Sequence, residues 1–207
     1  YQFRGANEEQ EQSAEFLLQA FALSMALMGI LLVTQFNSYY QALLILSSVL
    51  LSTSGVLVGL LITGQTFSVM LTGIGIVALA GIIVNNNIVL VDTFNVLKKD
   101  YPDWSLREII VQTGIQRLRP VFLTTFTTGF GLLPLAMGIS IDLIGAEVEV
   151  GGPIASQWAG LASTIVFGLS FATVLTLIVT PAMLALPDSI RATFKRPQKI
   201  SRESSPH

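Results

Sequence analysis

The chain has 207 residues, of which 52% are hydrophobic and 12% are charged, and its mean hydropathy is +0.68. A water-soluble domain usually carries about 25% charged residues, so this composition excludes an ordinary soluble domain and indicates a membrane protein. The net charge of -2 argues against a nucleic-acid partner. Cysteine is absent and the one histidine is His207, which excludes disulfides, thiolate metal sites and histidine-based catalytic triads. The carboxylates show no metal-ligand spacing.

The first 15 residues are polar and acidic, and they contain neither a positively charged n-region nor an apolar h-region. No signal peptide is therefore predicted. We expect residues 1–15 to be a periplasmic acidic lead-in to the first helix, with Asn7 as its cap and acidic residues in its first turn. The start at Tyr1 is interpreted as a cut inside a longer polypeptide.

Charged residues are missing from three long stretches of the chain, residues 16–91, 120–141 and 151–187. A helix rises about 1.5 Å per residue and the hydrocarbon core is about 30 Å thick, so the first stretch can cross three times and each of the others once. The sequence therefore predicts an all-α polytopic membrane helix bundle, whose transmembrane domain covers residues 16–187. The five expected spans are residues 16–36, 40–63, 67–91, 120–139 and 157–184.

The segment between the third and fourth spans predicts a helix of its own at about residues 105–118. Ser105 and Glu108 have the spacing of a capping box, with Trp104 and Ile109 placed as its hydrophobic staple. Apolar and polar residues then follow a pattern that is typical of an interfacial helix on the cytoplasmic membrane surface. A plain connecting helix fits the same residues. The polar tail, residues 188–207, is expected to be disordered.

The orientation follows from the basic residues. Five of the eleven Lys and Arg residues lie between Lys98 and Arg119, and five more follow the last span. Because basic loops stay in the cytoplasm, both segments are predicted to be cytoplasmic parts of a multi-pass membrane protein. The other side holds Arg4 as its one basic residue, together with most of the acidic residues. The N-terminus of the chain is therefore expected in the periplasm.

The third span carries a stripe of small and polar residues. Gly73, Gly81 and Asn85 recur at multiples of four residues, and Asp92 follows Asn85 by seven, so they share one helix face. Such a stripe is expected to face protein rather than lipid. Asp92 lies at the cytoplasmic end of the span, where a carboxylate is either part of a transport path or simply solvated.

Three consecutive amides, Asn85, Asn86 and Asn87, lie inside the same apolar span. An unsatisfied polar group there costs several kcal/mol, so each amide needs a hydrogen-bond partner or water. Two interpretations are open: a polar path or ion relay, and attachment of one helix to another by amide hydrogen bonds.

The second and fourth spans also carry small and polar residues on one helix face. Ser52, Gly55 and Gly59 share a face of the second span, which favours close helix packing. The fourth span carries Thr124 among other threonines, either for transport or for hydrogen bonds to its own helix. Arg117 precedes that span, where an arginine normally serves as an anchor at the membrane surface.

The run from Gly81 to Asp92, followed by the segment 117–120 and by Thr124-Thr125, resembles the last membrane helices of resistance-nodulation-division (RND) exporters of the hydrophobe/amphiphile type. Residues 35–38 resemble the turn after the eighth helix of those pumps, and residues 179–182 resemble the end of the twelfth. By this resemblance, the five spans are helices eight to twelve, the C-terminal membrane half of a twelve-helix pump.

The resemblance implies a secondary active transporter and not an enzyme, with proton antiport, H+ as the coupling ion and no cofactor. It implies export of hydrophobic or amphiphilic compounds, as in multidrug resistance. The implied partners are the N-terminal transmembrane half of the same polypeptide, further copies in a homotrimer, a periplasmic adaptor, an outer-membrane channel and the lipid bilayer. No nucleophile, base or metal set converges in the sequence, so no catalytic or metal residue is expected.

The resemblance also assigns roles to single residues. Asn85 occupies the position of a relay lysine, Thr124 matches a relay threonine, and Arg117 matches an arginine near the cytoplasmic water path. With their neighbours Asn86 and Asp92, they form the expected proton-relay set. An asparagine in place of lysine can hydrogen-bond a carboxylate but cannot neutralise its charge. This difference affects how proton transfer would be coupled to export.

Two alternatives belong to the same superfamily. One is a membrane scaffold or sensor, as in sterol-sensing relatives, and the other is a relative that exports lipid or assists protein secretion. Two large periplasmic domains and paired carboxylates in the fourth helix, both upstream of Tyr1, would favour the pump.

Overall fold

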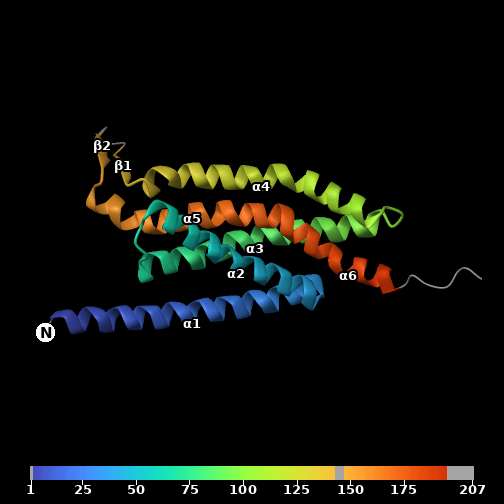
Figure 1. Cartoon of the computed structure of the whole chain (residues 1–207), viewed down its shortest axis with the longest axis horizontal. Coiled ribbons are helices and arrows are strands. Elements are labelled where there is room, and N and C mark those ends of the chain that lie inside the picture. Colours follow the sequence, from blue (N-terminus) through green and yellow to red (C-terminus); the bar gives the residue numbers. More distant parts are fainter. Residues whose placement is uncertain (1, 143–146, 195–207) are drawn as a thin grey trace, which may run out of the picture.

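A computed structural model describes residues 2–142 and 147–194. The long helices lie side by side in an elongated bundle, and α5, η1 and α6 form one continuous helix, called the α5 rod below, that bends after α5 (Figure 1). The predicted all-α class is confirmed. In chain order the elements are α1 (Gln2–Phe36), α2 (Tyr39–Thr63), α3 (Val69–Asp100), α4 (Leu106–Ala136), β1 (Ile139–Asp142), β2 (Glu147–Val150), α5 (Pro153–Val174), the π-helix η1 (Leu175–Val179) and α6 (Thr180–Phe194).

Within the described residues, four helical segments are long and apolar enough to cross a membrane: Gln10–Phe36, Tyr39–Thr63, Val69–Asp100 and Gln157–Pro187. They correspond to the first, second, third and fifth predicted spans. The fourth predicted span lies in α4, which runs alongside α5 (Figure 1) but is less apolar because of its arginines and threonines. The crossing by α4 therefore stays a prediction.

Three helix boundaries differ from expectation. α4 is continuous through Pro120, so residues 106–118 are helical as predicted but do not form a helix separate from the fourth span. α1 already begins at Gln2, so Asn7 is not its N-cap. α6 extends to Phe194 despite Pro187, so residues 188–194 are helical and not disordered, while 195–207 lie outside the described residues. A proline removes one N–H donor but need not end a helix whose remaining hydrogen bonds are kept.

A short β-hairpin follows α4 and was not predicted. β1 and β2 pair antiparallel, with Ile139 opposite Val150 and Asp142 opposite Glu147. The hairpin base is closed by a hydrogen bond from Gly151 N to Gly138 O at 2.9 Å, and both glycines have positive φ, 78° and 73°. Alternation of Glu and Val over 147–150 was the available signal, since period two is typical of a strand.

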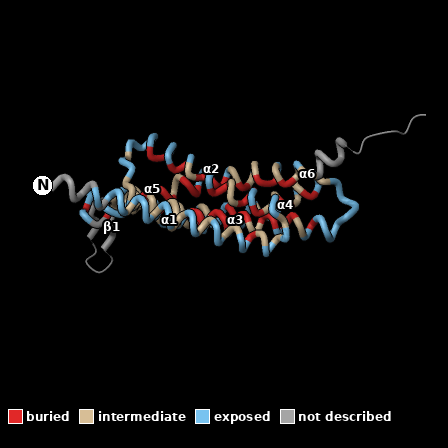
Figure 2. Tube along the Cα trace, turned by 90° about the horizontal axis from the view of Figure 1, so that it is seen from below, coloured by how far each residue is buried: buried red, intermediate tan, exposed pale blue. Residues whose placement is uncertain are grey.

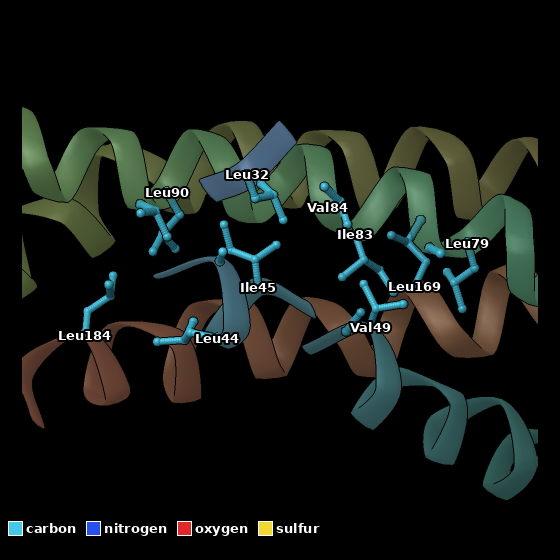
Figure 3. Close-up of a cluster of buried hydrophobic side chains, with 14 of the residues drawn as sticks. Leu32, Leu44, Ile45, Val49, Leu79, Ile83, Val84, Leu90, Leu169 and Leu184 are labelled. Atoms are coloured by element: carbon cyan, nitrogen blue, oxygen red, sulfur yellow. The ribbon is translucent and has the colours of Figure 1, made fainter. Parts of the chain in front are cut away.

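The core lies between α2, α3 and the α5 rod (Figure 3). α1 lies at the edge of the bundle and is largely exposed (Figure 2). It contributes one fully buried side chain, Leu32, to the core. The central side chains are aliphatic and at most 1% exposed: Ile45, Val49, Val56, Leu79, Ile83, Leu90, Val91 and Leu169.

Glycines allow α2 and α5 to approach closely. A Cβ atom at Gly55 would overlap the side chain of Phe171, and one at Gly59 would overlap Phe167. On the α3 side, a Cβ at Gly73 would lie 2.8 Å from the Leu17 side chain of α1. Small residues at these positions therefore let the phenylalanine rings pack directly on the α2 backbone.

Replacing Gly59 with alanine should destabilise the bundle, because the Phe167 ring would have to move out of a packed contact. We expect Gly59→Ala to lower the free energy of unfolding by about 1–3 kcal/mol, measured as a lower melting temperature in detergent. Gly129→Ala is the matched control, since no atom lies within 4 Å of its Cβ position. Equal melting temperatures for both variants would contradict the packing.

The predicted capping box at the start of α4 gives a second prediction. Ser105 Oγ donates to Glu108 Oε2 at 2.7 Å, and Ser105 N donates to the same oxygen at 2.7 Å. The first of these bonds, then the second, lowers the pKa of Glu108 below its ordinary 4.5. The cap is thus strongest when Glu108 is ionised, and its contribution is lost as pH falls through that lowered pKa.

In Ser105→Ala the Glu108 carboxyl should titrate closer to 4.5, because the largest cause of its shift is removed. The amides at the start of α4 should then exchange with deuterium faster at neutral pH. Hydrogen–deuterium exchange followed by mass spectrometry checks this, with the α2 amides as the internal reference. Unchanged exchange at Leu106–Glu108 would contradict the role of the cap.

Candidate functional site

The predicted polar stripe of α3 lies on the surface of the described bundle. Gly81, Asn85 and Asp92 are exposed, and no atom lies within 4 Å of a Cβ placed at Gly81. Within the described residues, neither the Asn85 nor the Asp92 side chain has a hydrogen-bond partner. From Gly81 to Asp92 the stripe therefore faces away from the part of the bundle that the structure describes, whereas Gly73 packs against Leu17 of α1.

The opposite face of α3 is buried. Asn86 is 9% exposed and Asn87 is 0% exposed. The Asn87 amide donates from Nδ2 to Ile83 O at 3.1 Å, and its Oδ1 accepts a hydrogen bond from Thr180 Oγ1 at 3.0 Å. Of the three consecutive amides, Asn85 is therefore exposed while Asn86 and Asn87 are buried. The Asn87 side chain joins α3 to α6.

Thr124 is exposed on α4. Its Oγ1 donates to Pro120 O at 2.6 Å, and Thr127 Oγ1 donates to Leu123 O at 2.8 Å. A Cβ placed at Gly131 would meet no atom within 4 Å. Both hydroxyls are thus satisfied by their own helix, on a surface that no described element covers.

Arg117 attaches α4 to α3. Its Nε donates to Thr93 Oγ1, and Thr93 Oγ1 donates to Val89 O at 2.8 Å. Thr93 is 5% exposed and directly follows Asp92. Among the described residues, Arg117 is therefore hydrogen-bonded to a threonine and not paired with Asp92. Thr93 was missed by sequence reasoning, because a single threonine near a span end carries no distinguishing signal.

Two further polar contacts between helices lie close to these residues. Gln41 of α2 and Asn95 of α3 exchange hydrogen bonds between their amides, at 2.8 and 3.0 Å. Thr125 of α4 and Thr173 of α5 join their hydroxyls at 2.6 Å. In the sequence these residues stand out only as polar side chains in or beside an apolar span, which does not indicate their partners. Together with Arg117–Thr93 and Asn87–Thr180, they fasten α3 and α4 to the rest of the bundle.

Chemically, the arrangement offers amides and hydroxyls but few charges. No Asp, Glu, Lys, Arg or His lies between residues 16 and 91 or between 120 and 141. Among the residues that the structure describes, no group of three His, Cys, Asp or Glu side chains could hold a metal ion. The exposed stripes can thus donate and accept hydrogen bonds to an ionisable group, but they do not supply one within the spans.

The AcrB/AcrD/AcrF family matches residues 1–187. The chain is 35% identical over 162 residues to the swarming motility protein SwrC of Bacillus subtilis (strain 168), covering 78% of this chain and 14% of that protein. It is 34% identical over 194 residues to the multidrug resistance protein MdtC of Edwardsiella ictaluri (strain 93-146), covering 93% of this chain and 17% of that protein.

A solved X-ray structure of a heavy metal efflux pump matches with a TM-score of 0.71 and 32% identity, over 87% of this chain and 17% of that one. The chain thus spans 14% to 17% of the length of these relatives. The family match includes the exposed faces of α3 and α4 and nearly the whole bundle. The chain therefore belongs to the AcrB/AcrD/AcrF family of RND efflux transporters, as part of their transmembrane region.

Proposed function

We propose that this chain is the C-terminal membrane half of a proton-driven efflux pump of the bacterial inner membrane. In this assignment α1, α2, α3, α4 and the α5 rod are helices eight to twelve. The observation that carries the proposal is the exposure of Asn85 in the middle of an apolar span. A lipid-exposed amide would cost several kcal/mol, so Asn85 requires protein or water beside it.

The N-terminal membrane half of the same polypeptide is the proposed occupant of this face. Its carboxylates would meet Asn85, whose amide can donate to an ionised carboxylate or accept from a protonated one. An amide leaves the negative charge of the carboxylate uncompensated, where a lysine would neutralise it. In this pump the carboxylate would therefore lose its negative charge only when it binds a proton. The net charge beside Asn85 would then change with each proton that is bound or released.

Thr124, Arg117 and Asp92 complete the proposed relay, with Asn86 beside Asn85. The Thr124 hydroxyl bonds to Pro120 O in the described bundle and could exchange that acceptor for a group on the missing half. Arg117, fixed by Thr93, would hold a positive charge near the cytoplasmic entrance, and its partner Thr93 directly follows the exposed Asp92. Assembly as a homotrimer with a periplasmic adaptor and an outer-membrane channel belongs to the same proposal.

The proposed substrates are hydrophobic or amphiphilic compounds, supported by the likeness to a protein named for multidrug resistance. A second candidate is a heavy metal ion as cargo, supported by the likeness to a heavy metal efflux pump. Ethidium, a hydrophobic cation, and Zn²⁺ are suitable probes for the two classes. Selection between them would lie in parts of the pump outside this chain.

The relay assignment predicts that Asn85→Leu and Thr124→Ala in the intact pump abolish export, because each removes a hydrogen-bonding group from the proton path. Export of ethidium or Zn²⁺ from cells measures this, with the amount of pump in the membrane checked by immunoblot. Phe130→Leu is the control, since Phe130 is exposed on α4 and carries no polar group. Normal export by both polar variants would defeat the assignment.

The arrangement of the ends supports the proposed orientation. The α3–α4 connection and the end of α6 lie at one end of the bundle, and the N-terminus, the α2–α3 connection and the hairpin lie at the other (Figure 1). The first end carries the basic residues between 98 and 119, and the hairpin carries Asp142, Glu147 and Glu149. Basic residues favour the cytoplasmic side.

Because the chain contains no cysteine, single cysteines can report its topology. We expect Asp103→Cys and Ser201→Cys to react with a membrane-impermeant maleimide only after the cytoplasmic side is opened. Thr66→Cys, in the α2–α3 connection, should react from the periplasm of intact spheroplasts. Labelling of Asp103→Cys and Ser201→Cys from opposite sides would refute the proposed orientation.

A further inference from the structure

Asn85 and Asn87 lie two residues apart on α3 and therefore point in directions about 200° apart around the helix. The burial agrees, because Asn85 is exposed while Asn87 is 0% exposed. Any contact that fixes the rotation of α3 at Asn87 thus fixes the direction in which Asn85 faces. The buried side chains of α3 contribute to this by packing, and at Asn87 itself the contact is the hydrogen bond from Thr180 Oγ1 to Asn87 Oδ1, at 3.0 Å.

Thr180 lies where the α5 rod is least regular. It is the first residue of α6, directly after the π-helix Leu175–Val179, and its N–H bonds to Leu175 O, five residues back. A π-turn holds one extra residue, which turns everything after it by about 100° around the rod axis. Pro181 follows and has no N–H to offer to the carbonyl four residues earlier. The rod therefore fixes the position of Thr180 weakly by its own hydrogen bonds.

The burial of Asn87 and Thr180 favours the hydrogen bond between their side chains. Both residues are at most 1% exposed, so water does not compete for either group. Two other hydrogen-bonded links from α3 side chains to a neighbouring helix involve Thr93 and Asn95, about two turns further toward the end proposed to be cytoplasmic. Without Thr180, the Asn87 oxygen would lose its described partner, whereas the Asn87 amide nitrogen would keep Ile83 O.

We propose that Asn87 is a positioning residue: its hydrogen bond to Thr180 fixes α3 against the π-helix of the last rod, so that Asn85 faces the proton-carrying partner. This inference rests on the proposed function. It assigns to the π-helix the role of placing the Thr180 hydroxyl on α3. α3 and the rod then change position together during transport and not independently.

Thr180→Val tests the bond in the intact pump, because valine keeps the shape of threonine and loses the hydroxyl. We expect an about tenfold drop in the maximal export rate, with the KM for the exported probe and the amount of pump in the membrane unchanged. The probe is ethidium or Zn²⁺, whichever the wild-type pump exports. Thr180→Ser should restore the rate, because serine returns the hydroxyl although it removes a buried methyl group.

Thr164→Val is the matched control. Thr164 is also 0% exposed, but its hydroxyl donates to Gly160 O of its own helix at 2.7 Å and to no other helix among the described residues. We expect near wild-type export from this variant. An equal drop for Thr164→Val, or failure of Thr180→Ser to restore export, would overturn the inference.

A double-mutant cycle tests the pairing itself. Asn87→Ala should lower the maximal export rate about as much as Thr180→Val, and the double variant should be no worse than either alone. If Asn87→Ala does not reach the membrane, Asn87→Leu, which fills the site, replaces it. Losses that multiply in the double variant would overturn the pairing.

The outcome separates this inference from the proposed function. If Asn85→Leu abolishes export while Thr180→Val leaves it unchanged, the relay assignment stands and the positioning role of Asn87 falls. If Asn85→Leu exports normally, or the wild-type pump exports neither probe, the proposed function falls and the inference falls with it.

Discussion

The constraint behind this structure is that polar groups inside hydrocarbon must find a partner other than water. The described threonines and serines mostly meet it locally, by bonding to a carbonyl three or four residues earlier, as Thr164 and Ser170 do. Amides cannot be satisfied so completely by their own helix, and they join helices instead, as Gln41 does with Asn95. Asn85 is the informative exception, because its face is left open by the described bundle.

Features that depend on local spacing could be predicted from the sequence. Long uncharged stretches located the helices, since nothing but a helix satisfies an isolated backbone in lipid. The capping box at Ser105 and Glu108 formed as predicted, because its hydrogen bonds join residues three positions apart. The spacing on α3 also grouped Gly81, Asn85 and Asp92 on one face, and these residues are exposed together.

Features that depend on partners distant in sequence could not be predicted. Nothing near Asn87 indicates Thr180, which is 93 positions away, or the π-turn that brings its hydroxyl into place. Arg117 was expected at a membrane surface, and its bond to Thr93 depends on how α3 and α4 pack. The continuity of α4 through Pro120 was missed because a proline was taken as a helix start, although the chain on both sides favours a helix.

The length of α1 has a mechanical consequence. Its 35 residues extend about 52 Å, well beyond a hydrocarbon core of about 30 Å. Its contacts with the core run from Phe21 to Phe36, and among its described side chains Leu32 is the fully buried one. The contacts of α1 extend back to Leu17, which packs against Gly73 of α3, so a tilt of this helix about these contacts would displace its N-terminal end the most. A domain joined to that end of α1 would thereby be coupled mechanically to the membrane bundle.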